Sequence, residues 1–389
     1  MAKNIGIFGS TGSIGCSSLD VINALGADYK VAALSAHSNV ELLAEQVRKY
    51  QPKYAAVTNP ACCDKFREIA GDYSGQILTG PESLIELGMS EEIDTIITAV
   101  VGAAGLGAAL SATKAGKTLA IANKEPLVIA GKLLTETAKA NGATILPVDS
   151  EHSAIFQIMH AGKVNEISKI ILTASGGPFR GASKKQIEKA SLEQALSHPT
   201  WRMGPKITVD SATMMNKALE IIEAVWLFGV SPDKIDVVVH PESIVHSLVE
   251  FVDGSVIAQM STPDMTLPIQ YALTYPKRVK GIARHLDLAE SGKLTFERPD
   301  REVFRAIELG FEVAAKAGTA GAVFNAANEA AVAEFLEGNI KFARIVELIE
   351  HCVNKNKFDV TSTASLELLG QADAWARREV AECLKEKVS

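Results

Sequence analysis

The sequence predicts an α/β protein with an N-terminal Rossmann-like, doubly wound parallel sheet, a central α+β domain and a C-terminal helical bundle. Three observations predict it. Apolar runs alternate with amphipathic stretches in the first part of the chain, an Asp-Gly dipeptide separates two strand-like runs in the middle, and the last part is rich in Ala, Glu and Leu at helical spacing. A chain of 389 residues allows two or three domains of roughly 150 residues each.

Six apolar runs in the first part of the chain predict strands, and amphipathic stretches long enough for a helix separate most of them. Such alternation predicts a parallel sheet with helices on both faces and right-handed crossovers. We expect this first domain to span residues 1–149. Its predicted strands are residues 3–8, 30–35, 54–58, 93–101, 117–122 and 144–148.

One stretch has the length of a membrane span without its composition. Residues 95–113 carry no charge, but they are rich in Ala, Gly and Thr and are bracketed by Asp94 and Lys114. We expect a buried strand over 96–101, a glycine turn and a buried helix, because few side chains here are large enough for a lipid-facing helix. No membrane partner is therefore expected.

The second part of the chain changes its pattern. Asp253-Gly254 lies between two strand-like runs and predicts a hairpin. We expect an α+β domain over 150–274, a connecting segment over 275–300 and a helical domain over 301–389. The predicted elements of the α+β domain are strands over 170–175, 235–240, 244–252 and 255–261, a polar helix, a loop over 198–205 and a long helix over 211–228.

Composition excludes several classes of protein. The chain carries 46 acidic and 39 basic residues, a net charge of −7, which argues against a broad basic face for nucleic acid. The five cysteines are odd in number and widely scattered, as expected of reduced thiols in the cytoplasm, and no spacing suggests zinc. The N-terminus has no signal-peptide pattern. We expect a cytoplasmic protein without nucleic-acid partners.

A glycine-rich turn follows the first predicted strand and opens a helix. Gly9, Gly12 and Gly15 lie in the sequence GSTGSIG. Glycines at such a turn let backbone N–H groups approach a pyrophosphate, and the helix N-terminus then faces the anion. A tight turn without a ligand is the alternative, but the strand–turn–helix context favours a dinucleotide. The expected contacts are Thr11, Gly12, Ser13 and Ile14.

The end of the second predicted strand bears on the choice between NAD and NADP. An NAD site usually has an acidic residue there, and this chain has His37, Ser38 and Asn39. The missing acid favours NADPH, because no carboxylate would repel the 2′-phosphate. No Lys or Arg stands there either, so we expect a preference for NADPH that is weaker than usual.

Asp149-Ser150-Glu151-His152 follows the last strand of the first domain, where open α/β sheets bind ligands. Two carboxylates without thiols suggest Mg²⁺ or Mn²⁺. A helix N-cap with an acidic first turn is the alternative and is favoured if this segment is taken alone.

The predicted helix after Ser211 favours a metal site over a plain helix N-cap at residues 149–152. Thr213, Asn216, Lys217 and Glu220 recur at three- and four-residue spacing and so share one face. Asn216 and Lys217 could hold a phosphate while Glu220 reaches a metal. The alternative is an ordinary surface pair of Lys217 and Glu220, worth only tenths of a kcal/mol.

Three further segments carry polar groups at the ends of predicted elements. Ser175 precedes Gly176-Gly177 and suits either phosphate binding or a plain turn. The loop over 198–205, with Trp201, is interpreted as a lid over the substrate, or else as a surface loop with one anchoring Trp. Asn123-Lys124-Glu125 follows a strand at the sheet edge that faces the cofactor.

Six motifs in this order resemble the 1-deoxy-D-xylulose 5-phosphate reductoisomerase family. They are GSTGSIG, NKE at 123–125, DSEH at 149–152, SGGPF at 175–179, HPTWRMG at 198–204 and SATMMNKALE at 211–220. The similarity extends through nearly the whole chain, including PESIVHS at 241–247 and the helical tail.

The resemblance implies rearrangement of 1-deoxy-D-xylulose 5-phosphate and reduction with NADPH to 2-C-methyl-D-erythritol 4-phosphate, an isoprenoid precursor, by a homodimer. For the carbon rearrangement, both a retro-aldol/aldol route and a direct shift stay open. The resemblance also implies one divalent cation held by Asp149, Glu151 and Glu220. The implied catalytic residues are Lys124, Glu151, His198 and Trp201, with Met203 beside Trp201 in the lid. The implied substrate contacts are Ser150, Glu151, Ser175, His198, Ser211, Asn216, Lys217 and Glu220. The expected cofactor contacts, taken from the residues and the resemblance together, are Thr11, Gly12, Ser13, Ile14, His37, Ser38, Asn39, Asn123, Lys124, Glu125, Gly204 and Met265.

One departure and two rival interpretations accompany the resemblance. The family commonly has Gly and then Lys or Arg where this chain has His37-Ser38, which bears on cofactor preference and not on the reaction. A semialdehyde dehydrogenase would need a nucleophilic Cys in the second domain, and none lies between Cys63 and Cys352. A nucleotide-sensing module would need neither a metal triad nor a polar helix face.

Overall fold

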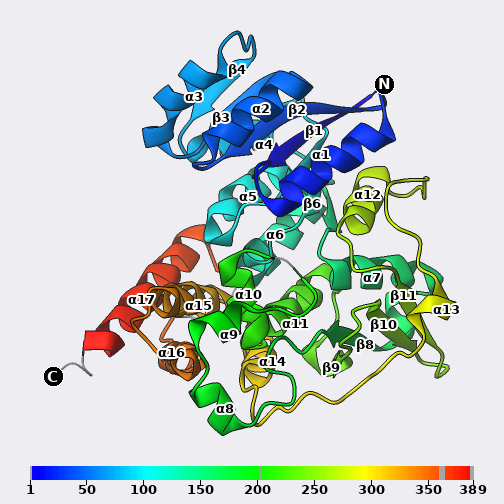
Figure 1. The fold of residues 1–389 in the computed structure, drawn as a ribbon, viewed down its shortest axis with the longest axis vertical. Helices are drawn as coiled ribbons and strands as arrows, with labels where there is room; N and C mark the ends of the chain where they lie inside the picture. Colours follow the sequence, from blue (N-terminus) through cyan, green and yellow to red (C-terminus); the bar gives the residue numbers. More distant parts are fainter. Residues whose placement is uncertain (1, 202, 359–363, 386–389) are drawn as a thin grey trace. The chain divides into compact units, whose positions relative to one another are not determined.

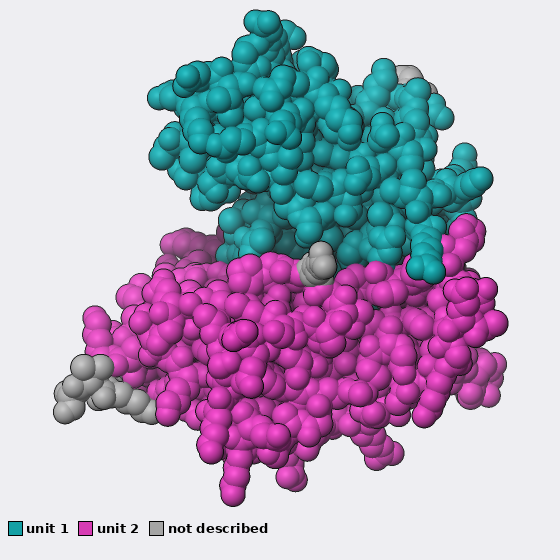
Figure 2. Space-filling view, in the orientation of Figure 1, with its two compact units in different colours: residues 1–126, 134–153, 264–284 teal, residues 127–133, 154–263, 285–389 magenta. Residues whose placement is uncertain are grey.

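The computed structural model describes residues 2–201, 203–358 and 364–385, which form two compact units (Figure 2). Unit 1 comprises Met1–Pro126, Leu134–Ser153 and Asp264–Arg284, and unit 2 comprises Leu127–Leu133, Ala154–Pro263 and His285–Ser389. These units divide the chain by contacts in space, so the domain boundaries expected from the sequence stay a prediction.

Unit 1 contains the predicted doubly wound sheet (Figure 1). Its seven strands are all parallel, in the order β4-β3-β2-β1-β5-β6-β7. The direction of winding reverses between β1 and β5, the position at which such sheets bind nucleotides. The strands are β1 (Lys3–Phe8), β2 (Tyr29–Ala36), β3 (Tyr54–Val57), β4 (Gln76–Thr79), β5 (Thr95–Thr98), β6 (Thr118–Ile121) and β7 (Thr144–Pro147).

Helices connect these strands. Right-handed crossovers put α1 to α3 on one face and α4 and α5 on the other, in agreement with the packing of α2 on α3 and of α4 on α5. α12 packs on α1. The helices are α1 (Ser13–Leu25), α2 (Val40–Tyr50), η1 (Pro60–Cys62), α3 (Cys63–Ala70), α4 (Glu82–Met89), η2 (Gly102–Gly105), α5 (Leu106–Lys114), α6 (Glu125–Asn141), α7 (Ser150–Ile158) and α12 (Thr266–Thr274).

Two details of unit 1 bear on the sequence predictions. The sequence did not predict β4, a four-residue edge strand that is partly exposed. The uncharged stretch over 95–113 forms β5, the η2 turn and α5, as expected. Among the described residues, no helix is both long enough and apolar enough to span a bilayer.

Unit 2 contains a mixed sheet in the order β11-β10-β8-β9. β8 pairs parallel with β9 and antiparallel with β10, and β10 and β11 form the predicted hairpin with Gly254 at φ 84°. The strands are β8 (Ile167–Ala174), β9 (Ile235–Val239), β10 (Val245–Phe251) and β11 (Val256–Met260).

The predicted C-terminal helical bundle is confirmed, since α14, α15, α16 and α17 make up most of the described chain after residue 305 (Figure 1). α15 packs on both α16 and α17, and α14 packs on α11. The helices of this part of the chain are η3 (Met159–Ala161), η4 (Val164–Glu166), α8 (Lys184–Glu188), α9 (Leu192–Leu196), α10 (Pro205–Ala212), α11 (Met215–Phe228), η5 (Pro232–Lys234), α13 (Leu288–Ser291), α14 (Ala306–Lys316), α15 (Ala320–Leu336), α16 (Phe342–Lys355) and α17 (Leu366–Lys385).

The single helix predicted over residues 211–228 is wrong: the structure has α10 and α11 with a tight turn between them. Met214 is left-handed at φ 60°, a conformation that costs roughly 1–2 kcal/mol for a residue other than glycine. The Thr213 hydroxyl lies 3.0 Å from the Val209 carbonyl oxygen and accepts from the Met215 amide at 3.3 Å, so it bridges the two helices. Thr213 therefore lies outside the helix face that carries the other polar residues.

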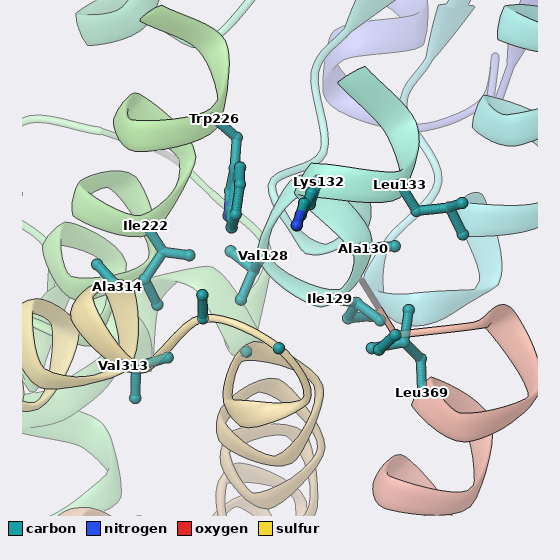
Figure 3. A pocket seen from close by; sticks show the side chains of 15 residues that line it. Val128, Ile129, Ala130, Lys132, Leu133, Ile222, Trp226, Val313, Ala314 and Leu369 are labelled. Carbon is teal, nitrogen blue, oxygen red and sulfur yellow. The ribbon is translucent and has the colours of Figure 1, made fainter. Parts of the chain in front are cut away.

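Unit 2 also contains a small, partly open pocket (Figure 3). α6 is kinked at Ala130, and its next residue, Gly131, lies against the indole of Trp226. A Cβ at Gly131 would lie 2.2 Å from that ring, so only glycine fits there. Ile222, Val313 and other apolar side chains form much of the lining, to which Lys132 also belongs.

Candidate active site

The glycine-rich turn has the shape that the sequence predicts. Gly9 follows β1 at φ 87°, and a Cβ there would lie 2.4 Å from the Ala99 carbonyl oxygen. A Cβ at Gly15 would lie 2.3 Å from the Gly9 carbonyl oxygen. Glycine is therefore required at both positions, because the turn, β5 and the start of α1 approach each other too closely for a side chain.

Ser10 braces this turn from behind. Its side chain is fully buried and donates to Gln46 Oε1 at 2.7 Å, while Gln46 Nε2 donates to the Ser10 carbonyl oxygen at 2.8 Å. The next four residues, Thr11–Ile14, are exposed or half-buried at the N-terminus of α1. The first N–H groups of a helix have no partner within the helix, so this turn can accept a pyrophosphate.

Asn123 is the best indication of where the rest of a dinucleotide would bind. It follows β6 and is 8% exposed, and no described residue offers a hydrogen bond to either atom of its side-chain amide. Buried amides are nearly always hydrogen-bonded, so this one suits a ligand. Gly105, which sequence reasoning did not single out, makes room for it: a Cβ there would lie 2.6 Å from Asn123 Nδ2. The neighbouring Lys124 and Glu125 are also buried.

The segment expected to recognise the adenosine ribose lies after β2 and is exposed. His37 Nδ1 lies 3.0 Å from Thr58 Oγ1, so one ring nitrogen is engaged within the protein. Asn39 Oδ1 caps α2 through the Leu42 amide at 3.3 Å, which leaves its NH₂ group as the outward donor. The structure thus offers neutral hydrogen-bonding groups at this position. Met265, another expected cofactor contact, is half-buried at the N-cap of α12.

Asp149 and Glu151 lie together where β7 leads into α7. A carboxylate oxygen of each lies within 4.8 Å of the other, close enough to share one cation. The Glu151 amide donates to Asp149 Oδ1 at 3.3 Å, and the Ser150 hydroxyl donates to Glu151 Oε2 at 2.6 Å. Asp149 thus also caps the helix, so the two interpretations of this segment are compatible.

Lys124 forms an ion pair with Asp149. Burial opposes ionisation of Asp149, but the Lys124 ammonium, with a smaller contribution from His152, outweighs it and holds the pKa of this carboxyl well below its usual range. The carboxylate is therefore charged at neutral pH, the form that a cation requires.

The polar face of α11 lies in unit 2. Glu220 accepts from Asn216 Nδ2 at 2.6 Å and forms an ion pair with Lys217. Lys217 is 3% exposed and Glu220 is fully buried, so the surface-pair interpretation is wrong. Two charges buried in this way are costly unless each has partners, which makes a functional role more plausible than a role in solubility.

Ser175 and His198 form a hydrogen-bonded pair in unit 2. His198 Nδ1 accepts from the backbone amides of Thr200 and Trp201 at 3.1 and 2.9 Å. The neutral ring therefore carries its proton on Nε2, 3.0 Å from Ser175 Oγ. Ser175 Oγ also accepts from the Gly177 amide at 3.2 Å, so its own proton points elsewhere and suits an anionic ligand. Burial lowers the pKa of His198, which favours the neutral ring.

The remaining expected site residues of unit 2 lie in the segment after His198 and where α10 and α11 meet. Trp201 and Met203 are half-buried, and Gly204 is the N-cap of α10. Ser211 is in the last turn of α10, and Asn216 and Lys217 are in the first turn of α11. In one continuous helix, residues five apart point about 140° away from each other, so the break at Met214 frees Ser211 from that geometry.

These features fit a dinucleotide-dependent oxidoreductase that has a carboxylate cluster and a polar helix start. Family models of 1-deoxy-D-xylulose 5-phosphate reductoisomerase match residues 5–131, with models of its C-terminal domains matching 145–228 and 260–379. The chain belongs to the 1-deoxy-D-xylulose 5-phosphate reductoisomerase family, and it is an NADP-dependent oxidoreductase.

Relatives and solved structures agree over nearly the full chain. The reductoisomerase of Chloroherpeton thalassium is 49% identical over 97% of this chain and 97% of its own, and that of a Geobacillus species is 48% identical over 98% and 100%. A DOX-P reductoisomerase solved with NADPH, fosmidomycin and magnesium is 40% identical with a TM-score of 0.92 over 98% of each chain. The Zymomonas mobilis enzyme, solved with NADPH, is 40% identical with a TM-score of 0.92 over 99% of each chain.

The two nitrogens of His198 predict different effects for two substitutions. His198→Asn keeps an acceptor near the Thr200 and Trp201 amides, because an Asn side chain makes the same local turn. His198→Gln can still reach Ser175 but gives up that acceptor. We expect limited proteolysis between residues 198 and 204 to be unchanged in His198→Asn and faster in His198→Gln.

The control measurement is the free energy of unfolding as a function of pH on the acid side of neutrality. Folding lowers the pKa of His198, so the unfolded chain binds a proton on this ring more readily than the folded chain does. The contribution of His198 to the free energy of unfolding is therefore lost as pH falls below roughly 6.5. Both variants should lose that part of the pH dependence. Equal proteolysis of the two variants would contradict the assigned tautomer.

Proposed function

We propose that this chain performs the reaction of its family through the residues described above. It converts 1-deoxy-D-xylulose 5-phosphate to 2-C-methyl-D-erythritol 4-phosphate in the non-mevalonate isoprenoid pathway, with NADPH and a divalent cation. The observation that carries the proposal is that one family model spans residues 145–228, which contain all three expected metal ligands and the whole expected phosphate set.

The cofactor residues hold NADPH along unit 1. Thr11, Gly12, Ser13 and Ile14 bind the pyrophosphate with backbone amides, Asn123 donates to the nicotinamide end, and Met265 packs near that ring. Lys124 and Glu125 follow Asn123, and Gly204 adds a contact from the lid segment. Support comes from the accessible helix start and from the orphaned Asn123 amide.

Asp149, Glu151 and Glu220 hold the cation, Mg²⁺ or Mn²⁺. The donor set consists of three carboxyl groups, whose oxygens suit a hard divalent ion. When bound, the cation stabilises negative charge on the substrate oxygens, and NADPH supplies the hydride for reduction. Ser150 contacts a substrate hydroxyl, and Lys124, which already neutralises Asp149, lies on the substrate side.

Ser175, Ser211, Asn216 and Lys217 bind the substrate phosphate. His198 donates to Ser175 Oγ and thereby turns the serine proton toward the anion, while Lys217 brings a positive charge. The phosphate is remote from the reacting carbons, so its binding energy orients the reacting end and draws Trp201 and Met203 over it, excluding water.

Glu220→Gln tests the reaction and the metal site together. In the wild type, NADPH oxidation with 1-deoxy-D-xylulose 5-phosphate should stop on chelation with EDTA and return with Mg²⁺ or Mn²⁺. The variant keeps the shape and loses the charge, so the Mg²⁺ concentration for half-maximal rate should rise at least tenfold, about 1.4 kcal/mol, while KM for NADPH is unchanged.

The matched control is Glu223→Gln, which removes another buried charge one turn later on α11. Its Mg²⁺ requirement should stay at the wild-type value. Near wild-type rates for Glu220→Gln at limiting Mg²⁺ would remove Glu220 from the metal site, and EDTA-resistant turnover by the wild type would reject metal dependence itself.

The preference for NADPH over NADH is expected to be weak, because His37 and Ser38 stand where the family has a cationic clamp. Ser38→Arg should raise the ratio of kcat/KM for NADPH to that for NADH by about tenfold or more, since a charged hydrogen bond is worth roughly 1.5–3 kcal/mol. Ser74→Arg adds the same charge to an exposed loop of unit 1 and should leave the ratio unchanged. A clear preference of the wild type for NADH would contradict the assignment.

The enzyme is a homodimer, and β11 is the surface that supports this. β11 is an edge strand, and the exposed Val252, Val256 and Ile257 lie on it or just before it. Unpaired edge strands readily pair with a second chain, and Lys blocks such pairing. Ile257→Lys should convert the dimer to monomer in sedimentation experiments, whereas Val279→Lys, elsewhere on the surface, should not. A monomeric wild type would reject the dimer.

The compartment is the cytoplasm. All five cysteines, Cys16, Cys62, Cys63, Cys352 and Cys383, are free thiols in the structure, which suits a reducing environment. Fractionation of cells that produce the enzyme is the measurement, and recovery with membranes or secreted material would contradict this location.

A further inference from the structure

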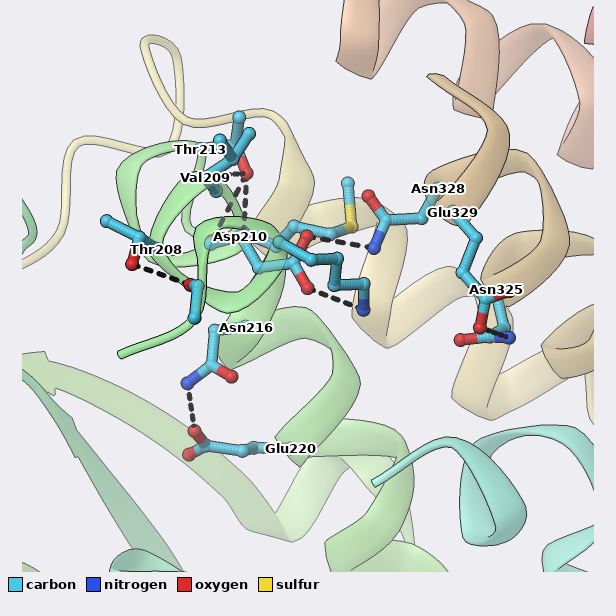
Figure 4. Close-up of polar contacts among 12 residues, drawn as sticks. Thr208, Val209, Asp210, Thr213, Asn216, Glu220, Asn325, Asn328 and Glu329 are labelled. Carbon is cyan, nitrogen blue, oxygen red and sulfur yellow. Dashed lines mark hydrogen bonds and ion pairs between the residues drawn. The ribbon is translucent and has the colours of Figure 1, made fainter. Parts of the chain in front are cut away.

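α10 and α15 are joined by a buried polar contact. Asn328 of α15 is fully buried, and its Nδ2 donates to Oδ1 of Asp210, which is 1% exposed, at 3.0 Å (Figure 4). Lys206, one turn earlier on α10, lies 2.7 Å from the other carboxylate oxygen, Oδ2. Each oxygen of Asp210 therefore has its own partner, one on its own helix and one 118 residues away in sequence.

This contact fixes the orientation of the end of α10. A buried carboxylate is expensive to leave unsatisfied, so turning Asp210 away from Asn328 would break a buried hydrogen bond. Ser211 is the next residue in the chain. Its direction is thus set by a side chain that is tied to α15.

Asp210 is also connected, through Thr213, to the start of α11. The Thr213 hydroxyl lies 3.2 Å from the Asp210 carbonyl oxygen and accepts from the Met215 amide, as Figure 4 shows in part. A chain of contacts therefore runs from α15 through Asp210 and Thr213 to the first turn of α11. That turn carries Asn216 and Lys217.

We propose that Asn328 and Asp210 are positioning residues for the substrate phosphate. α15 of the C-terminal bundle holds the α10–α11 turn so that Ser211, Asn216 and Lys217 face one anion. The proposal rests on the phosphate site proposed above. It gives the C-terminal helices a part in substrate recognition, although Asn328 itself touches neither phosphate nor substrate.

Asn325 provides a matched control on the same helix. It is also fully buried, and its Nδ2 donates at 2.9 Å to Glu329 of α15 itself. Within the described chain, Oδ1 of Asn325 and Oδ1 of Asn328 alike have no hydrogen-bond partner. Replacing either residue by Ala thus removes one buried amide and one donated hydrogen bond, but only Asn328→Ala breaks the contact with α10.

The experiment compares Asn328→Ala, Asn325→Ala and wild type in three measurements. KM for 1-deoxy-D-xylulose 5-phosphate and Ki for inorganic phosphate, used as a competitive inhibitor, should both rise about tenfold in Asn328→Ala, or about 1.4 kcal/mol. KM for NADPH should not change. Asn325→Ala should lower Tm by a similar amount without moving KM or Ki. Equal effects of the two variants on Ki, or no effect of Asn328→Ala, would overturn the proposal.

A reciprocal exchange adds a test that a purely structural role would fail. Asn328→Asp puts two carboxylates together, so this variant should bind phosphate poorly. The double variant, which combines Asp210→Asn with Asn328→Asp, again has an amide facing a carboxylate. Ki for phosphate should return toward the wild-type value in the double variant, and no recovery would count against the proposal. If Asn328→Asp does not fold, Asn328→Ala decides.

Ser211→Ala separates this proposal from the one on which it rests. If the wild type is active and Ser211→Ala leaves both KM for 1-deoxy-D-xylulose 5-phosphate and Ki for phosphate unchanged, the proposed phosphate site itself is wrong. If Ser211→Ala raises both and Asn328→Ala raises neither, the phosphate site stands and the positioning role fails.

Discussion

Buried carboxylates held by lysines are the constraint on which this structure depends. Asp149 pairs with Lys124, Asp210 with Lys206 and Glu220 with Lys217. Each pair lies within one compact unit. Removing one partner from such a pair typically costs 3–5 kcal/mol, because the remaining charge has no compensation. Each lysine therefore compensates its acid and fixes the direction of the carboxylate. The proposed cation site and the proposed phosphate-binding turn both depend on carboxylates held in this way.

Local sequence patterns were enough to predict most of the fold. The strands after which Gly9, Asn123 and Asp149 lie were all predicted, because buried parallel strands are continuous apolar runs with polar residues at their ends. The edge strand β4 was missed. It has four residues, and a short, half-exposed strand leaves too little periodicity to be recognised.

The break between α10 and α11 could not be predicted from local propensity. Neither Thr213 nor Met214 is a helix breaker, and the segment has helical spacing throughout. The turn forms because the Thr213 side chain binds backbone groups on both sides of it. The contact of Asp210 with Asn328 was equally invisible, because no local pattern links residues so far apart in sequence. The sequence could name the members of the proposed phosphate site but could not reveal the contacts that hold the α10–α11 turn in place.

The brace behind the glycine-rich turn has a consequence for how a nucleotide meets this enzyme. Ser10 and Gln46 exchange two hydrogen bonds in the buried interior, so the loop is already rigid when the protein has folded. Immobilising a flexible loop costs roughly 1–2 kcal/mol per residue in backbone entropy, and here that cost falls on folding and not on association. The pyrophosphate should therefore bind to a preorganised loop. Its binding should require little reorganisation of the turn and should give only a small heat-capacity change from this part of the site.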